Sequence, residues 1–427
     1  MSIFSLIALL LTLTAVLAFV NYRLLRLPSA VGLMGLSLAF SLVLIGAGEL
    51  GMPLRSWAAA TVANVDFSAA LLNGMLSFLL FAGALHVDID ELREQRLAIA
   101  ALATVGVLIS SALVGGASYA LFNLLGLNIP LLACLTFGAL ISPTDPIAVL
   151  TLLKDARAPG SLSTRIAGES LFNDGVGIVV FLVMFRLLVD RGNTFQWAET
   201  GLLLLQEVGG GLALGLVLGG ICFLMLKSVD NYQVEVMLTL ALVSGGYQLA
   251  SAVHASGPLA IVTAGLLIGN YGRKLAMSDL TRTNLDNFWE LLDEILNGIL
   301  FVLIGLELLL LNFLPLYILA ASLSIPIVLG ARLASLALPA GVMRLARRGG
   351  LRLSLLTWGG LRGGISIALA LTLPTGRARD LIVVTTYAIV AFSLLCQATT
   401  LPWLLRKTLI KDPPGGNEEI ATQHAGR

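Results

Sequence analysis

The sequence predicts an all-α polytopic membrane protein with thirteen transmembrane helices, arranged as an inverted repeat of helices 1–6 and 8–13. Three observations predict it. Apolar residues make up 57% of the 427 residues and charged residues 12%, whereas a soluble domain is about 25% charged. The apolar segments reach the roughly 20 residues that a spanning helix needs. Two of them, the fifth and the twelfth, are interrupted by proline or glycine.

The loops between the apolar segments are short, so no soluble domain of appreciable size is expected. The first segment lacks a small-residue cleavage site and is expected to remain as a helix. The candidate spans cover approximately residues 2–21, 30–49, 69–87, 98–124, 129–153, 166–189, 201–226, 233–252, 256–271, 288–312, 315–342, 353–374 and 380–405.

The sequence contains no phosphate-binding loop, HExxH zinc motif or GxSxG nucleophile elbow. These motifs carry much of the enzymatic chemistry that can be recognised in a sequence. We therefore expect neither an enzyme nor a bound cofactor, and no nucleic-acid partner.

The basic residues predict how the chain is oriented. If the N-terminus is outside and the loops alternate, most of the 26 Lys and Arg residues fall in cytoplasmic loops. Cytoplasmic loops of membrane proteins carry such an excess. We therefore expect a multi-pass protein of the cell membrane with an outer N-terminus and a cytoplasmic C-terminus. The outer loops would hold only Arg55, Arg186, Arg191, Arg377 and Arg379.

The fifth span is interrupted by the sequence SPTDP at residues 142–146. An interior proline costs a helix about 3 kcal/mol, and a charged residue at the bilayer centre costs about 2.5–3.5 kcal/mol on insertion scales. A break at this depth is tolerated where the freed backbone lines a cavity or is buried in protein. Asp145 is expected to cap a second half-helix that begins at Pro146. The freed carbonyls and the Thr144 hydroxyl would then be available as hard oxygen ligands.

Three buried charged residues are predicted to share one depth. Asp145 and Asp174 each lie nine residues from a basic residue at the predicted cytoplasmic end of their span, and Arg362 lies ten. At 1.5 Å per residue, each is roughly 14–15 Å from the inner surface, the middle of a bilayer core about 30 Å thick. Three separate segments therefore converge on one plane.

The sixth span adds further polar residues near this plane. Ser170 and Asp174 share a helix face because they are four residues apart, and Asn173 lies beside them. Buried arginines remain charged and favour carboxylate partners, so we expect Glu169 to pair with Arg362. Arg332 is a possible second arginine partner for Asp174 and Asp145, although its Gly-Ala-Arg context points equally to a fixed role elsewhere. Asp174 and Asp145 would then be available to bind a small monovalent cation.

The two interrupted spans are seven helices apart, as are the third and tenth spans, which share a faint resemblance. An odd offset inverts the second copy relative to the first. Transporters commonly contain two inverted halves with an interrupted helix at the matching position in each.

Four stretches together resemble the cation–proton antiporter superfamily, in its NhaP/NHE branch of sodium/proton antiporters. They are SPTDPIAV, GESLFNDGVGIV, FWELLDEILNGILFVLIGLEL and WGGLRGGISIALAL, and the resemblance covers about residues 70–405. It implies exchange of protons for Na⁺, or Li⁺ or K⁺, by a homodimer in which the two interrupted helices cross. Asp174 would bind ion and proton, with Asp145, Thr144 and Ser170 contributing and with Glu169 and Arg362 as the stabilising pair. An Asn before the Asp, here Asn173, is similar to the electroneutral branch.

The resemblance also implies a division into an interface domain, which dimerises, and a mobile core transport domain. Helices 1–3 and 8–10 would form the interface domain, helices 4–6 and 11–13 the core, and helix 7 the linker. The boundaries are 1–97 and 229–314 for the interface domain, 98–190 and 315–410 for the core, 191–228 for the linker and 411–427 for a short cytoplasmic tail.

Several features leave alternatives open. Relatives carry an acid near the position of Ala82, so one cation ligand is missing here or replaced by water. Asp293 and Glu294 belong either to a wet or capped part of their helix, which we favour, or to a cytoplasmic funnel. The glycines at 211, 215 and 219 form a close-packing face, more simply within the subunit than at a dimer seam.

Two other functions could use a similar architecture. A sodium-coupled symporter of an organic solute would need a larger, apolar-lined cavity with polar anchors. A passive cation channel would need rings of acids or carbonyls around an axis, whereas this chain has one asymmetric acid cluster and a compensating arginine.

Overall fold

The computed structural model describes residues 3–50, 58–60, 62, 66–94, 96–145, 149, 153, 160–189, 197–311, 314–342 and 353–409. The regular elements of this part of the chain are all helical, with no strand, as the composition predicted. Eight of the described helices are long and apolar enough to cross a membrane, and two shorter apolar helices accompany them. The exact count of thirteen spans stays a prediction. The tail after Lys411 and the predicted outer residues Arg55 and Arg191 lie outside the described residues.

The first part of the chain contains nine described helices, several of them joined end to end by five-residue π-helical turns. The helices are α1 (Ile3–Val20), α2 (Ser29–Glu49), α4 (Phe67–Ala70), α5 (Leu76–Leu85), α6 (Ile89–Glu94), α7 (Arg96–Ala101), α8 (Val107–Leu124), α9 (Leu131–Ile141) and α11 (Gly160–Val189). The turns are η1 (Asn21–Leu25), η2 (Leu71–Met75) and η3 (Leu102–Gly106).

The second part continues in the same manner. Its helices are α12 (Trp197–Lys227), α13 (Tyr232–Ala252), α14 (Gly257–Leu267), α15 (Arg273–Leu275), α16 (Asp279–Glu307), α17 (Pro315–Val342), α18 (Leu353–Trp358), α19 (Gly364–Leu371), α20 (Arg377–Phe392) and α21 (Ala398–Leu409). The turns η4 (Ile268–Gly272) and η7 (Ser393–Gln397) are π-helical, and η5 (Leu308–Leu310) is a 3₁₀ turn.

Polar side chains mark the first residues of three helices in the second part. The side chain of Asn231 accepts the N–H groups of Gln233 and Val234 at the start of α13. The hydroxyls of Ser256 and Ser278 accept backbone N–H groups at the starts of α14 and α16. Each cap satisfies donors that have no partner within the helix, so the local sequence fixes where these helices begin.

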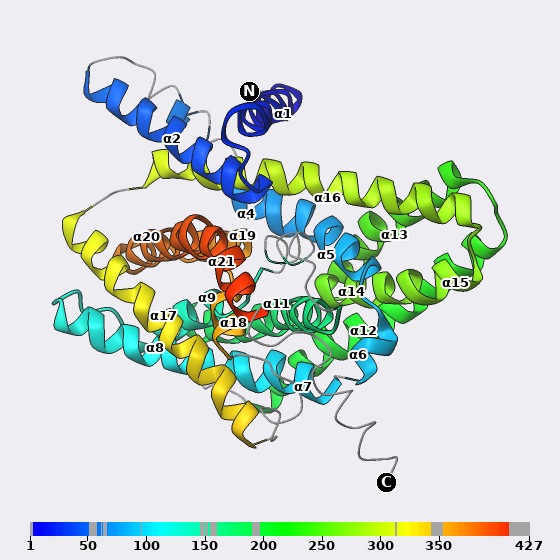
Figure 1. The fold of residues 1–427 in the computed structure, drawn as a ribbon. Coiled ribbons are helices and arrows are strands. Elements are labelled where there is room, and N and C mark those ends of the chain that lie inside the picture. The colour runs from blue at the N-terminus through cyan, green and yellow to red at the C-terminus, as the bar shows by residue number, and fades with distance from the viewer. Residues whose placement is uncertain are drawn as a thin grey trace, which may run out of the picture.

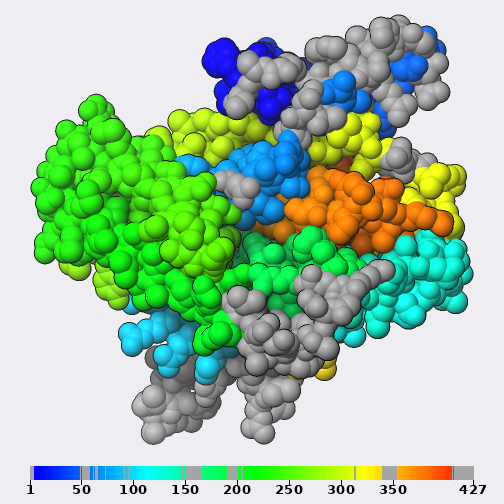
Figure 2. All heavy atoms as spheres, turned by 180° about the vertical axis from the view of Figure 1, so that it is seen from behind, coloured from blue at the N-terminus to red at the C-terminus, as the bar shows by residue number. Residues whose placement is uncertain are grey.

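The long helix α16 runs across the molecule (Figure 1). Helices α1 and α2 lie along one flank of it, and α12–α15 gather at one end of the molecule, while α8 and α17 lie toward the opposite end. The segment α18–α21 lies between α16 and α17. Viewed from behind, the C-terminal helices are again seen between the N-terminal segment around α5 and the helix α8 (Figure 2).

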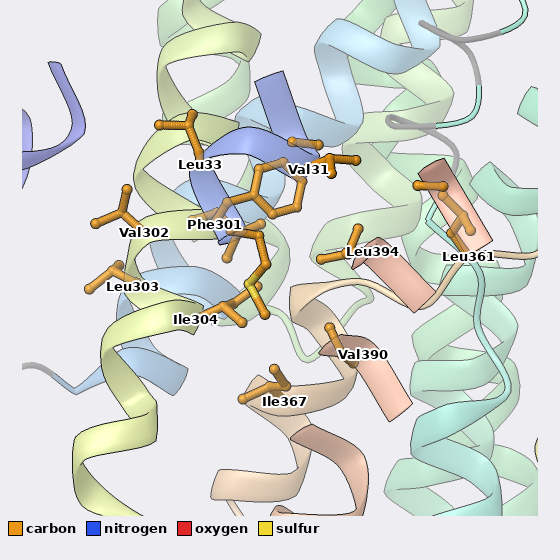
Figure 3. Close-up of a cluster of buried hydrophobic side chains, with 14 of the residues drawn as sticks. Val31, Leu33, Phe301, Val302, Leu303, Ile304, Leu361, Ile367, Val390 and Leu394 are labelled. Carbon is orange, nitrogen blue, oxygen red and sulfur yellow. The ribbon is translucent and has the colours of Figure 1, made fainter. Parts of the chain in front are cut away.

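A cluster of buried apolar side chains joins α2 and α16 to the C-terminal helices (Figure 3). Leu33 of α2 and Phe301 of α16 belong to the same cluster as Ile367 of α19, Val390 of α20 and Leu394 of η7. All five are at most 5% exposed. The contact between the first helices and the C-terminal helices is therefore made largely of apolar surface.

Both predicted interruptions are present. Helix α9 ends at Ile141, and residues 142–145 are not helical. In the twelfth predicted span, residues 359–363 separate α18 from α19. The predicted restart of the fifth span at Pro146 lies outside the described residues.

The glycine face of α12 packs within the subunit, against α14, as the sequence favoured. A Cβ atom on Gly215 would collide with the carbonyl oxygen of Ala260 and the side chain of Thr263. Gly211 and Gly219 meet the same helix at Ser256 and Ala264. Small residues allow helix backbones to approach closely in membranes, so this face fixes the distance between α12 and α14.

We expect Gly215→Ala to destabilise the protein by about 1–3 kcal/mol, because the added methyl group overpacks the contact. Gly220→Ala on the same helix is the matched control, since a Cβ there meets no atom within 4 Å. The control should be neutral or stabilising by up to about 1 kcal/mol, because alanine favours a helix over glycine. Thermal unfolding in detergent measures the difference, and equal melting temperatures for the two variants would contradict the assignment of this contact.

Candidate functional site

The two interrupted segments cross at their breaks. The backbone N–H of Asp145 donates to the carbonyl of Leu361 at 2.8 Å, which joins the break after α9 to the break before α19. The carboxyl group of Asp145 lies against Gly363, where a Cβ atom would collide with it. Only glycine permits this approach, which explains the glycine at position 363.

Arg362 donates hydrogen bonds to carbonyl groups that the break after α9 leaves without a partner in the helix. Its Nη1 donates to the carbonyl oxygens of Ser142 at 2.5 Å and Pro143 at 2.8 Å. Its backbone N–H donates to the hydroxyl of Ser393 at 2.9 Å. Buried carbonyls without a donor would cost free energy, so the guanidinium, only 2% exposed, satisfies backbone that α9 leaves open.

Thr144 is held by two residues of α11. The side-chain amide of Asn173 accepts the N–H of Thr144 at 3.2 Å and donates to its hydroxyl at 2.7 Å. The hydroxyls of Thr144 and Ser170 lie 3.0 Å apart. All three side chains are buried. The structure thus brings together three predicted site residues, and Asn173 uses both ends of its amide to hold the break.

Asp145 and Asp174 lie at a cavity of about 480 Å³, which is also lined by residues of α5, α16 and α19. Asp174 is 5% exposed and Asp145 is half-buried. The two carboxylates of the predicted cation site therefore reach one cavity from different segments. Oxygen ligands of this type suit small, hard cations.

Glu169 does not form the pair that the sequence suggested. Its carboxylate lies 2.6 Å from Nη1 of Arg332 on α17, and Arg362 contacts the carbonyls of the break. Glu169 and Arg332 are both buried. The physical reason is that the freed carbonyls at 142 and 143 already take up the guanidinium of Arg362, which leaves the carboxylate to the other buried arginine. The sequence did not pair Glu169 with Arg332, because nothing in it indicates which carboxylate Arg332 of α17 approaches.

The cavity contains residues whose roles the sequence did not reveal. His86, Glu290 and Asn297 line it. Asp293 and Glu294 line it as well, although a wet part of the helix seemed the simpler assignment. The spacing of residues 290, 293 and 297 by three and four places them on one helix face, and this signal was present in the sequence. The wall also contains Ala82, the position where relatives are expected to carry an acid.

A serine cluster behind the first break was also missed. The hydroxyl of Ser142 donates to the carbonyl of Gly138 at 2.7 Å and lies 2.9 Å and 3.2 Å from the hydroxyls of Ser110 and Ser111 on α8. These bonds satisfy the polar groups at the end of α9. Serines are common in packed membrane helices, so the sequence carried no distinct signal for this cluster.

The ion pair yields a prediction about stability. A double-mutant cycle between Glu169→Gln and Arg332→Gln should give a coupling energy of roughly 1–3 kcal/mol, because the two buried groups are in contact. Arg332→Gln alone should destabilise by about 3–5 kcal/mol, since it leaves a buried carboxylate unpaired. The exposed pair of Arg282 and Asp279 on α16 is the control, with an expected coupling below about 1 kcal/mol. A larger coupling of Glu169 to Arg362 than to Arg332 would contradict the observed pairing.

Comparisons with known proteins identify relatives over nearly the whole chain. The family model described as "Sodium/hydrogen exchanger, transmembrane" matches residues 8–407. The Na(+)/H(+) antiporter NhaP of Pseudomonas aeruginosa is 49% identical over 415 residues, which cover 96% of this chain and 97% of the relative. The Na(+)/H(+) antiporter NhaH of Halobacillus dabanensis is 36% identical, over 86% of this chain and 91% of its own.

The fold is similar to that of a solved structure, the sodium proton antiporter MjNhaP1 from Methanocaldococcus jannaschii. The two superpose with a TM-score of 0.65 at 22% sequence identity, covering 89% of this chain and 98% of the other. At this identity the likeness supports the fold alone. The family match spans nearly the whole sequence, and its apolar helices are those of a multi-pass membrane protein. The chain therefore belongs to the transmembrane sodium/hydrogen exchanger family.

Proposed function

We propose that this chain exchanges protons for Na⁺, or for Li⁺ or K⁺, across the membrane by alternating access. The observation that carries this proposal is the position of Asp174 and Asp145, at a cavity where two broken helices cross. The names of the relatives, Na(+)/H(+) antiporters, support the same assignment.

The charges at the crossing support a site that binds one proton or one monovalent cation at a time. At the crossing, two arginines, Arg332 and Arg362, accompany three carboxyl groups, those of Glu169, Asp145 and Asp174. With these five groups ionised, one negative charge remains in excess at the crossing, apart from the acidic residues of α16 on the facing wall of the cavity. A single proton or a single monovalent cation neutralises this charge, so the two ions compete for one site.

This competition couples the two fluxes. An unpaired carboxylate buried in a low-dielectric barrier costs several kcal/mol, so the empty, charged site is hindered from crossing the membrane. A proton or a cation on Asp174 removes this penalty, and the loaded site can then face the other side. We expect the Na⁺ concentration for half-maximal exchange to rise as the pH falls, because protons occupy the same carboxylate.

We infer that the core, residues 98–190 and 315–410, moves against an interface domain of residues 1–97 and 229–314. The cavity lies between these two sets, since its walls come from α5 and α16 on one side and from the crossing on the other. Their shared boundary includes the apolar cluster of Figure 3. An apolar boundary offers few directional bonds that would have to break during sliding. Residues 191–228 would link the two domains.

Orientation and assembly follow from the same proposal. The exposed apolar residues of α1, among them Phe4, Ile7 and Phe19, provide a surface for a homodimer within the bilayer. The distribution of basic residues supports an outer N-terminus and a cytoplasmic C-terminus in the cell membrane. In this orientation His86 and Glu290 mark a cavity mouth on the cytoplasmic side.

We further propose that exchange is electroneutral, with one proton for one cation. Asn173 occupies the position before Asp174, and its amide is engaged with Thr144 at both ends. It therefore adds no charge to the site, and the excess charge at the crossing remains that of one carboxylate.

Asp174→Asn should abolish exchange to the level of empty liposomes, because the amide neither takes a proton nor provides an anionic ligand. The measurement is alkalinisation of a trapped pH dye after Na⁺, Li⁺ or K⁺ pulses to proteoliposomes. Asp279→Asn, at an exposed position of α16, is the matched control and should keep wild-type exchange. Wild-type rates in Asp174→Asn would refute the proposal. A conductive cation leak from the wild-type protein would indicate a channel, and cation pulses without alkalinisation a symporter.

Asn173→Asp should introduce charge movement into the cycle. The new carboxylate still accepts the N–H of Thr144, but it adds a second titratable group beside Asp174. Currents on solid-supported membranes, compared between the variant and the wild-type protein, measure this. Exchange by the variant without any transient current would count against the role assigned to Asn173.

A further inference from the structure

The last residue of α16 is a buried glutamate at the boundary between the two proposed domains. Glu307 is 5% exposed, and the adjacent Leu306 belongs to the apolar cluster that also contains Tyr387 of α20. Glu307 lies about 25 Å along α16 from Glu290, which lines the mouth of the cavity, at 1.5 Å per residue. It therefore lies toward the outer end of the boundary, away from the cytoplasmic mouth.

Two polar side chains of α20 accompany this glutamate. The charge of Glu307 acts on the guanidinium of Arg379 and on the hydroxyl of Tyr387. Arg379 is half-buried, and its Nη2 donates to the carbonyl of Leu371 at the end of α19, at 3.3 Å. Glu307 belongs to the proposed interface domain and the other three residues to the proposed core. The attraction between Glu307 and Arg379 therefore acts across the boundary, and it changes whenever the core moves.

Two buried donors in this group have no acceptor in the part of the chain that the structure describes. They are the Nε of Arg379 and the hydroxyl of Tyr387. A buried donor without a partner costs about 1–3 kcal/mol. Water would satisfy both donors if the boundary opened on this side. The opposite charges thus favour the closed boundary, whereas the unpaired donors disfavour it.

We propose that Glu307 and Arg379 form a latch that keeps the outer side of the boundary closed while the cavity is open to the cytoplasm. This inference rests on the proposed antiport, its orientation and its moving core. A carboxylate left in a low-dielectric boundary without a counter-charge costs several kcal/mol. The two groups therefore separate only when water reaches Glu307, so their separation and the opening of the outer side are one event.

The latch predicts effects of opposite sign at neighbouring positions. Removal of either charge weakens the closed state, so the outer side should open more often. Removal of the Tyr387 hydroxyl takes an unpaired donor out of the closed state, so the outer side should open less often. Residues that only filled space at the boundary would not divide in this way.

The test measures opening of the outer side with a thiol at position 367 in the full-length protein. Ile367 of α19 is 1% exposed and lies in the apolar cluster of the boundary (Figure 3). In a protein with Ile367→Cys and Cys396→Ser, a membrane-impermeant thiol reagent added from outside should label position 367 only when this side opens. Cys134 and Cys222 are buried and are retained.

In this background, Glu307→Gln and Arg379→Gln should each raise the labelling rate roughly tenfold, because the rate follows the population of the open state. Their effects should not multiply in the double variant, since both changes remove the same attraction. Tyr387→Phe should lower the rate, and Glu307→Asp, which keeps the charge, should stay close to the unchanged background. Arg377→Gln is the matched control; Arg377 is an exposed arginine at the start of the same helix, and its removal should not change the rate.

Three results would overturn the latch. They are unchanged labelling in both Glu307→Gln and Arg379→Gln, an equal rise in Arg377→Gln, and faster labelling in Tyr387→Phe. Thermal unfolding shows that each variant is folded; if a charge-removing variant is not, the sign of the change in Tyr387→Phe decides the question. A failure of the antiport proposal would appear separately, as an absence of exchange in the wild-type protein.

Discussion

The contact on which the site depends is that of the Arg362 guanidinium with the carbonyl oxygens of Ser142 and Pro143. A membrane helix that stops at mid-depth leaves carbonyls without donors, and no water is available in the hydrocarbon to satisfy them. The buried guanidinium of Arg362 supplies both the missing hydrogen-bond donor and a positive charge. With this contact in place, the crossing segments can hold Asp145 against Gly363. The approach in turn brings the carboxyl group of Asp145 to the cavity.

A second layer of bonds makes the crossing rigid. Asn173 and Ser170 hold Thr144, and the hydroxyls around Ser142 satisfy the end of α9. These bonds among polar side chains hold the break in one position. Asp145 and Asp174 differ from these side chains in position, because both line the cavity.

The cavity has walls from both of the proposed domains. The carboxyl groups at the crossing belong to the proposed core, and Glu290 and Asp293 of α16 line the same cavity from the proposed interface domain. Between the two, much of the contact surface is apolar, and apolar contact is not directional. A boundary of this type favours relative movement, whereas the satisfied polar network inside the core opposes distortion. In the proposed exchange, the crossing and its carboxyl groups would move together past α16.

The sequence by itself determined the helical membrane class, the two interruptions and the convergence of Asp145, Asp174 and Arg362, because hydropathy, proline and glycine act locally and depth follows from helix rise. It also fixed the close-packing glycines of α12. Only the tertiary structure decided the partners: Arg332 for Glu169, two carbonyls for Arg362, and Thr144 for both ends of the Asn173 amide. It placed Asp293, for which the sequence had left two positions open, at the cavity that Asp145 and Asp174 line. Which side chains become partners depends on how each helix is rotated about its axis and on the angle at which helices cross. The sequence gives the depth of a residue in the membrane but neither of these angles, so it cannot choose between partners at equal depth.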